Sequence, residues 1–423
     1  MKKDLNSIFG DLSRSLFSLS DKEYKEKSEK SYIQEQIALE HGVYFSSIAS
    51  NLDTYSNDDF VNETIHKFRE LVGKTGQYRD RETIGTHPDF GHLESSDNTE
   101  NHYIVSMFVD IKNSTSIYLK TNDLVWTKTF KNTVLRIITM FLRVFDGHIH
   151  RLQGDAVFSY FGWKDKCEED AIIDSLNASS FLLWYIEHTL NPQLVELDYE
   201  PLKIRIGIDF GKDEDVLWSE YGFAPATEVT TTSLHTDLAA KLQNRASSNS
   251  ILIGNNIKEF LDLPDEFIAI KQYQKDGIKV DDTHILNKPQ KRYRMWIFKH
   301  KNYLKYFPVL HSTNFNLSCT VDSDIPYFPN IEVLDKGKSL EYIVDGAPGF
   351  IDSIRTMTNY EWSKENRGEE ARKNNNEGKL PASRSVHNVA NEATSFRGHH
   401  IMQCQILEFN KVKETLKFGI FIK

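Results

Sequence analysis

The chain has 423 residues, of which 39% are hydrophobic and 12% aromatic, and its formal net charge is −10 at pH 7. This length exceeds that of one ordinary domain, so two or three folded units with substantial cores are expected. The acidic balance argues against a protein that grips nucleic acid through a basic face.

The cysteines and the apolar runs indicate a soluble cytoplasmic protein. Cys167, Cys319 and Cys404 lie far apart and form neither a metal-type pair nor a disulfide framework, which favours a reducing compartment. The first residues lack the unbroken apolar stretch of a signal peptide. The longest apolar run, residues 134–145, is about one third too short to span a bilayer. No membrane segment is therefore expected.

The N-terminal part has a different pattern from the rest of the chain. Residues 1–80 carry apolar side chains at helical spacing, and residues 86–101 are polar and turn-rich like a linker. An apolar run of strand length then covers residues 102–109 and ends at Asp110. The elements expected next are a helix over 126–145, strands over 148–152 and 156–161, a helix over 168–189, a strand over 202–208, a helix over about 236–246, and strands over 250–254 and 292–298.

This strand–helix–hairpin–helix–strand order predicts an α+β sheet with helices on one face. From about residue 325 the pattern is again β-like, with loops rich in Gly and Asn. We expect a helical N-terminal segment and linker over residues 1–100, an α+β unit over 101–300, and a β-rich domain over 325–423. No internal repeat is visible, so the chain holds one copy of the α+β unit.

Two carboxylates stand at special places in this unit. Asp110 follows a buried strand, and Asp155 occupies a Gly-Asp turn between two apolar strands. Adjacent strands would bring both to one edge of the sheet, where they repel each other unless cations neutralise them. Mg²⁺ or Mn²⁺ suits such oxygen ligands, and two ions about 4 Å apart can activate a 3′-hydroxyl and stabilise a leaving diphosphate. Alternatively, Asp110 caps a helix and Asp155 merely fills a turn.

Four segments resemble, in order, the signatures of class III nucleotidyl cyclases: FVDIKNST, HRLQGDAVFSYFG, RIGIDFG and SLHTDLAAKLQNRASSNSILIG. The resemblance implies a ferredoxin-like cyclase sheet and two Mn²⁺ or Mg²⁺ ions per site. Asp110, Asp155 and the backbone carbonyl of Ile111 would hold the metals. The N–H groups of the following loop would contact the triphosphate, as turn backbones do for anions; these belong to Lys112, Asn113 and Ser114.

The last of these segments departs from the family at two positions. Where the family has an Asn for the ribose and, four residues on, an Arg for the transition state, this chain has Asp237 and Lys241. Side chains four apart leave the same helix face. Lys241 keeps the positive charge but loses the bidentate fork of arginine. The alternative is that the two form an exposed Asp–Lys pair.

The base-reading positions also depart from those of adenylate cyclases, which use a Lys and an Asp. Arg151 and Thr230 stand there in this chain. No carboxylate at the second position would accept from an adenine amino group, and arginine only donates. Uracil and guanine offer suitable acceptors, and cytosine offers N3 and O2. The smaller pyrimidine ring is favoured, with a preference for uracil. Arg151 can also be an ordinary residue at a strand end.

The C-terminal part resembles a sensor domain that accompanies bacterial defence nucleotidyltransferases and cyclases. The matching residues are Trp362, Asn366, Gly368, Glu370, Ala371, Arg397 and Gly398, and the alternative is that they have only structural roles. Together, the two parts resemble the pyrimidine cyclases of bacterial Pycsar antiphage systems. That resemblance implies conversion of UTP to cyclic UMP, or of CTP to cyclic CMP, with the product read by a separate effector.

The same resemblance implies a homodimer with shared active sites, because each site combines the metal residues of one subunit with the Asp237–Lys241 helix of the other. A uridylate cyclase is preferred over a cytidylate cyclase. The alternatives are a purine cyclase and a catalytically inactive homologue that binds nucleotide for regulation. Retention of both Asp110 and Asp155 argues against the inactive homologue.

Overall fold

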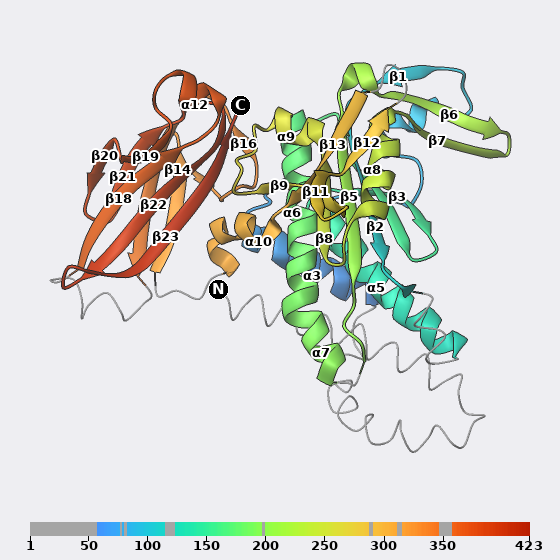
Figure 1. The fold of residues 1–423 in the computed structure, drawn as a ribbon, viewed down its shortest axis with the longest axis horizontal. Helices are drawn as coiled ribbons and strands as arrows, with labels where there is room; N and C mark the ends of the chain where they lie inside the picture. Colours follow the sequence, from blue (N-terminus) through green and yellow to red (C-terminus); the bar gives the residue numbers. More distant parts are fainter. Residues whose placement is uncertain are drawn as a thin grey trace.

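A mixed sheet flanked by helices forms one part of the molecule, and a β-sandwich forms the other (Figure 1). The computed structural model describes residues 57–76, 78–79, 83–114, 123–196, 199–286, 291–310, 315–346 and 358–423. The helices expected before residue 57 lie outside the described residues. The helix α3 (Asn57–Val72) is the first described element.

The centre of the sheet follows a β-α-β-β-α-β path. Its strands lie in the order β5-β2-β4-β3, and each is antiparallel to its neighbours within this set. This is the ferredoxin-like arrangement, so the predicted α+β class is confirmed. The elements are β2 (Ile104–Ile111), α5 (Leu124–Val144), β3 (His148–Gln153), β4 (Ala156–Phe161), α6 (Glu168–Tyr185) and β5 (Ile204–Gly211).

Further strands extend the sheet beyond β5. The strand β8 runs parallel to β5, and the next strand along the edge, β13, is antiparallel to β8. Two short strands pair with β13, and a small separate hairpin precedes it. These elements are β8 (Ser250–Gly254), α9 (Asn255–Phe260), β9 (Ile268–Ile270), β10 (Gln272–Lys275), β11 (Ile278–Asp281), β12 (Thr283–Leu286), β13 (Lys291–Phe298) and α10 (His300–Tyr303).

A hairpin that the sequence did not predict follows β5. Its strands β6 (Leu217–Phe223) and β7 (Ala226–Thr232) pair with each other, and β1 (Thr99–Asn101) pairs with β6. The hairpin projects from the sheet at the right of Figure 1. Its run of threonines lacks a continuous apolar pattern, which is why no strand was expected there.

The two faces of the sheet carry different elements. Ile206 and Ile208 of β5 belong to the large core shared with α3, α5 and α6. Between them Gly207 points to the opposite face, where an added Cβ would lie 2.1 Å from the backbone nitrogen of Gln243. The helix α8 (Leu234–Arg245) therefore packs on the face opposite α5 and α6. The expectation that all helices lie on one face is wrong for α8.

The C-terminal part is a sandwich of two five-stranded sheets around its own core. The first sheet contains β14 (Phe315–Val321), β15 (Ile325–Tyr327), β17 (Ser339–Gly346), β20 (Arg384–Val386) and β21 (Val389–Ala393). The second contains β16 (Val333–Leu334), β18 (Thr358–Asn366), β19 (Gly378–Pro381), β22 (Gly398–Glu408) and β23 (Lys411–Ile422), with α12 (Glu369–Lys373) after β18.

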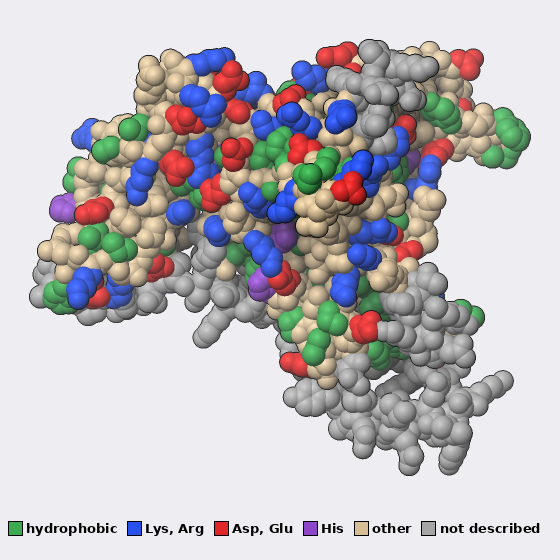
Figure 2. Space-filling model, viewed as in Figure 1, with side chains coloured by type: hydrophobic (Ala, Val, Ile, Leu, Met, Phe, Trp, Pro, Cys, Tyr) green, Lys and Arg blue, Asp and Glu red, His purple; other side chains and the backbone are tan. Residues whose placement is uncertain are grey.

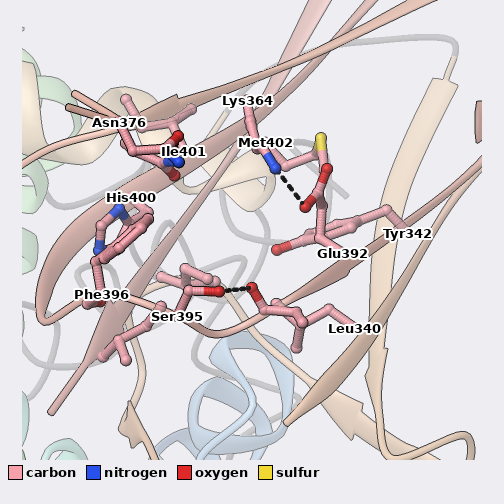
Figure 3. Close-up of a pocket in the computed structure, with 14 residues that line it drawn as sticks. Leu340, Tyr342, Lys364, Asn376, Glu392, Ser395, Phe396, His400, Ile401 and Met402 are labelled. Carbon is pink, nitrogen blue, oxygen red and sulfur yellow. Dashed lines mark hydrogen bonds and ion pairs between the residues drawn. The ribbon is translucent and has the colours of Figure 1, made fainter. Parts of the chain in front are cut away.

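A cavity of about 130 Å³ lies between these two sheets. Lys364 of β18 and Glu392 of β21 form an ion pair across it at 2.8 Å, and His400 lies on its wall (Figure 3). Burial lowers the pKa of His400 to about 4, so the ring is neutral at physiological pH. The ion pair joins the two sheets in the interior of the sandwich.

The sensor-like motif faces the cyclase-like unit. Arg397 donates to the carbonyl of Phe260 at 2.8 Å, and its guanidinium lies over the Phe260 ring. At Gly368, where φ is 98°, a Cβ would lie 2.7 Å from an Asp262 carboxylate oxygen. By contrast, Trp362 lies in the core of the sandwich. Part of the motif therefore fixes the contact with α9, and part of it supports the sandwich.

A group of buried charges ties α3 to the rest of the unit. Arg69, whose side chain is 3% exposed, pairs with Asp146, which also contacts Lys74 and Lys166. Both lysines pair with the fully buried Asp174. Burial opposes ionisation of Asp146, yet the three cations hold the pKa of its carboxyl below the ordinary value of 3.8.

None of the helices in the described part of the chain is long and apolar enough to cross a bilayer. On the face shown in Figure 2, acidic and basic side chains are interspersed.

Replacing Asp146 by Asn should lower the free energy of unfolding by about 3–5 kcal/mol at pH 7, because it leaves buried cations without their partner. A carboxyl with a lowered pKa stabilises the fold above pH 3.8 and loses this effect as the pH falls further. The deficit of the variant should therefore shrink in acid. Urea denaturation at several pH values measures it. Glu63→Gln, which breaks the exposed pair with Lys67, is the control and should cost less than about 0.5 kcal/mol.

Candidate active site

Asp110 and Asp155 lie at the same end of the sheet. Asp110 lies opposite Ala156 in the register of β2 against β4, and Ala156 directly follows Asp155. Asp155 itself sits in the turn between β3 and β4, where Gly154 has a φ of 65° that favours glycine. The strand pairing thus brings together two acidic residues that are distant in the sequence.

Two residues that the sequence did not single out hold the Asp110 carboxylate. Arg205 lies opposite Asp110 in the register of β5, and its guanidinium forms an ion pair with Oδ2. Gln243 of α8 donates to the same oxygen at 3.0 Å. Arg205 is the first residue of the RIGIDFG segment, and only the pairing of this strand with β2 reveals that it faces Asp110. The Asp110 side chain is only 16% exposed, and the Arg205 guanidinium balances its negative charge.

The donor set at this end fits a hard divalent cation. Two carboxylates and the carbonyl of Ile111 are all oxygen ligands of the kind Mg²⁺ and Mn²⁺ prefer. The part of the chain that the structure describes contains no group of three or more His, Cys, Asp or Glu side chains that could hold a metal. Substrate phosphate and water would complete the coordination of ions held by these oxygens, as at catalytic sites that keep open positions.

The loop after β2 begins at this same end. The Lys112 N–H donates to the Lys203 carbonyl at 2.8 Å, which extends the pairing of β2 and β5. Asn113 is exposed and has a φ of 61°, and the Ser114 side chain is buried. A phosphate contact from the Lys112 N–H would require this bond to open, whereas the Asn113 and Ser114 contacts stay predictions.

Asp237 and Lys241 lie on the exposed side of α8. Across the part of the helix that the structure describes, no ion pair joins their side chains, so the alternative of a mere surface pair is not what is observed. The other side of α8 is fixed to the sheet. His235 contacts Asp209 of β5 at 3.0 Å, and the Tyr293 hydroxyl donates to the same carboxyl at 2.7 Å. Burial raises the pKa of Asp209.

The expected base-reading positions have partners that the sequence did not reveal. Arg151 on β3 forms a bidentate pair with Glu228 on β7, through Nε at 3.1 Å and through Nη2. Thr230, two residues further on the same strand face, exchanges a hydrogen bond of 3.0 Å with the buried Tyr160 hydroxyl. A carboxylate therefore does stand near Arg151, at residue 228 rather than at residue 230. Because the sequence did not predict β7, it gave no signal for Glu228.

Comparisons with known proteins identify relatives of this chain. A cytidylate cyclase of Staphylococcus aureus is 37% identical over 399 residues, which cover 89% of this chain and 92% of that protein. A cytidylate cyclase of Escherichia coli is 30% identical over 426 residues, which cover 90% of each. Residues 298–423 match the family described as the adenylyl/guanylyl and SMODS C-terminal sensor domain.

Among solved structures, the adenylyl cyclase CyaB from P. aeruginosa is 15% identical, covers 48% of this chain and 95% of its own, and gives a TM-score of 0.39. The expected preference for uridylate is not supported, because the similar relatives are cytidylate cyclases. That preference was based on Arg151 and Thr230 alone and did not consider Glu228, which pairs with Arg151 in the structure.

Gly207→Ala should disturb the site by pushing α8 from the sheet. The new Cβ would lie 2.1 Å from the Gln243 nitrogen and 2.3 Å from the Ala239 carbonyl oxygen, so the helix backbone must move. We expect a loss of about 1–3 kcal/mol in the free energy of unfolding, measured by chemical denaturation. Gly91→Ala is the control, since no atom lies within 4 Å of its added Cβ. Equal stability of the two variants would contradict the close packing of α8.

Proposed function

Because this chain belongs to the family of cytidylate cyclases, which are class III nucleotidyl cyclases, we propose that it converts CTP to 3′,5′-cyclic CMP and diphosphate. The observation that supports the proposal is the β2–β4 register, which sets Asp110 opposite Ala156, the residue after Asp155. A protein that only bound nucleotide for regulation would not need two carboxylates at one sheet end. The similarity to cytidylate cyclases over about nine tenths of the chain supports CTP as the substrate.

In this proposal the end of the sheet holds the reacting groups. Asp110, Asp155 and the Ile111 carbonyl are the protein ligands of the divalent ions. Two bound Mg²⁺ or Mn²⁺ ions supply activation of the ribose 3′-hydroxyl and neutralise charge on the departing diphosphate. Asn113 and Ser114 lie directly after β2 and offer N–H groups to the triphosphate.

The exposed side of α8 holds the other half of the site. Lys241 places a positive charge against the phosphorus at which the ring closes, where negative charge develops in the transition state. Asp237 lies one helical turn earlier on the same side and accepts a hydrogen bond from the ribose. Because both side chains point to solvent, they are open to a nucleotide held by a second subunit.

A homodimer with two shared sites follows from this arrangement. Each chain carries one metal half and one α8 half. Large apolar side chains are exposed near both halves: Leu152 on β3, Leu234 at the start of α8, and Phe223, 79% exposed, at the hairpin tip. Figure 2 shows hydrophobic side chains at the far right, where Figure 1 places this tip. Exposed apolar side chains of this kind favour burial of this surface against a second subunit.

We also propose that the cyclic nucleotide acts as a second messenger in antiphage defence and is read by a separate effector protein. The resemblance to Pycsar cyclases supports this role, and the presence of a sensor domain in the same chain is consistent with regulated synthesis.

The substrate proposal is tested by incubating the purified protein with Mn²⁺ and each of the four ribonucleoside triphosphates. We expect cyclic CMP as the main product, identified by mass spectrometry. Dominant cyclic AMP or cyclic GMP would favour a purine cyclase, and dominant cyclic UMP would restore the uridylate preference. No cyclic product from any of the four would favour a nucleotide-binding homologue without activity.

Asp155→Ala should lower kcat by at least about two orders of magnitude, since it removes charge that stabilises the reacting phosphates. The variant should also lose Mn²⁺ binding measured by calorimetry in the presence of a non-hydrolysable CTP analogue. Asp97→Ala, an exposed aspartate outside the site, is the control and should leave both quantities unchanged. Full activity of Asp155→Ala would remove the metal role from this residue.

Mixing inactive Asp110→Ala and Lys241→Ala chains should restore activity. In a random 1:1 mixture, half of the dimers contain one chain of each kind, and each such dimer has one intact shared site. About one quarter of the wild-type activity is therefore expected. The mixture is compared with each variant alone after joint refolding. No complementation would place both halves of a site within one subunit.

A further inference from the structure

Arg151 and Glu228 form a bidentate pair between two strands. Its two hydrogen bonds use the Nε and Nη2 groups on one edge of the guanidinium. The side chains come from different strands, β3 and β7, and are 46% and 34% exposed. A bidentate contact fixes the plane of the guanidinium as well as its position.

Glu228 is itself restrained from the interior. The buried ring of His150 lies against it, with Nε2 3.0 Å from Oε1. The other ring nitrogen of His150 contacts the carbonyl of Gly85 at 2.9 Å, so the ring cannot turn freely. Burial lowers the pKa of His150. The His150 ring therefore bounds the space on the interior side of the carboxylate, and the two hydrogen bonds from Arg151 fix the direction of its guanidinium relative to Glu228.

The opposite edge of the Arg151 guanidinium is then left for a ligand. Glu228 occupies Nε and one hydrogen of Nη2, and no other hydrogen bond to Arg151 is formed within the described residues. Nη1 and the second hydrogen of Nη2 present two parallel donors. Such a fork matches a group with two adjacent acceptors.

The pyrimidine bases differ in this respect. Cytosine carries two adjacent acceptors, N3 and O2, on one edge. In uracil a donor, N3–H, separates the two carbonyl oxygens, so it would face a guanidinium N–H. Adenine has no pair of adjacent acceptors, while guanine offers O6 and N7 on a larger ring.

We propose that Glu228 is a positioning residue that orients Arg151 as a two-donor fork for N3 and O2 of cytosine, and that this fork rejects uracil. The inference rests on the proposed function, since it names how the same site selects its base. Arg151 touches the base, and Glu228 acts through Arg151.

The test compares kcat/KM for CTP and UTP in Mn²⁺ for the wild-type protein, Glu228→Gln and Arg151→Lys. A glutamine amide would set an N–H₂ group against the guanidinium, and lysine has no fork. Each variant should reduce the CTP-to-UTP ratio by about tenfold or more, mainly through KM for CTP. GTP is included as a third substrate, because the fork could also bind O6 and N7 of guanine. A higher kcat/KM for GTP than for CTP in the wild-type protein would overturn the cytosine assignment.

The sensor part of the chain offers a matched control. Arg372 of α12 and Glu377 form a bidentate pair of the same geometry, at 2.9 and 2.8 Å, within the C-terminal domain. Glu377→Gln should leave the CTP-to-UTP ratio within twofold of the wild type. Equal effects of Glu377→Gln and Glu228→Gln would overturn the proposal.

The exchanged double variant, R151E with E228R, separates positioning from simple stabilisation. It can re-form an ion pair and so regain thermal stability, but its fork starts from β7 and points elsewhere. We expect restored melting temperature without restored preference for CTP. Recovery of the CTP preference in this variant would show that the ion pair acts only by stabilising the fold, and would overturn the proposal. If the wild type forms cyclic CMP and Glu228→Gln keeps the wild-type ratio, only this inference fails; if the wild type forms none, the proposed function fails.

Discussion

The pairing register of β2 against β4 and β5 is the constraint on which the site depends. It sets Asp110 opposite Ala156 on one side and opposite Arg205 on the other. A slip by one residue would turn Asp110 towards the core that α5 and α6 cover, because strand side chains alternate between faces. The apolar residues of β2 that alternate with Asp110, such as Val109, make such a slip costly, since they would lose their burial. Packing of the core therefore positions the carboxylate.

The same register balances charge before any cation binds. Arg205 neutralises Asp110, and Gln243 adds a neutral donor from α8. A partly buried carboxylate pair would otherwise repel itself. Since Gln243 belongs to the helix that carries Lys241, a shift of α8 changes the surroundings of Asp110 directly.

The C-terminal domain contacts the same sheet through Phe260. The ring of Phe260 packs on Phe210 of β5, with ring centroids 4.8 Å apart, and its carbonyl accepts a hydrogen bond from Arg397. These contacts connect the C-terminal domain directly to β5.

Local pattern was sufficient for the elements that form the core. The apolar run before Asp110 and the stripe over residues 126–145 each predicted one element, because one-sided or complete burial leaves a period in the sequence. The hairpin β6–β7 left no such signal, because each of its strands has only one buried residue, Trp218 in β6 and Val229 in β7. The partners of site residues were also beyond local pattern. Arg205 meets Asp110, and Glu228 meets Arg151, only through pairing between segments far apart in the chain.

The unsupported preference for uracil shows that the identity of one site residue does not determine which base is bound. An arginine alone donates to any acceptor, so Arg151 by itself suits uracil, cytosine or guanine. Choice between uracil and cytosine requires two donors held in a fixed direction, because the bases differ in the order of donors and acceptors along one edge. That direction comes from a second residue. Glu228 removes one edge of the guanidinium from use, and a buried histidine ring limits where Glu228 can lie. Under our proposal, base selection depends on this contact between β3 and β7, so a substitution at residue 228 alone changes it.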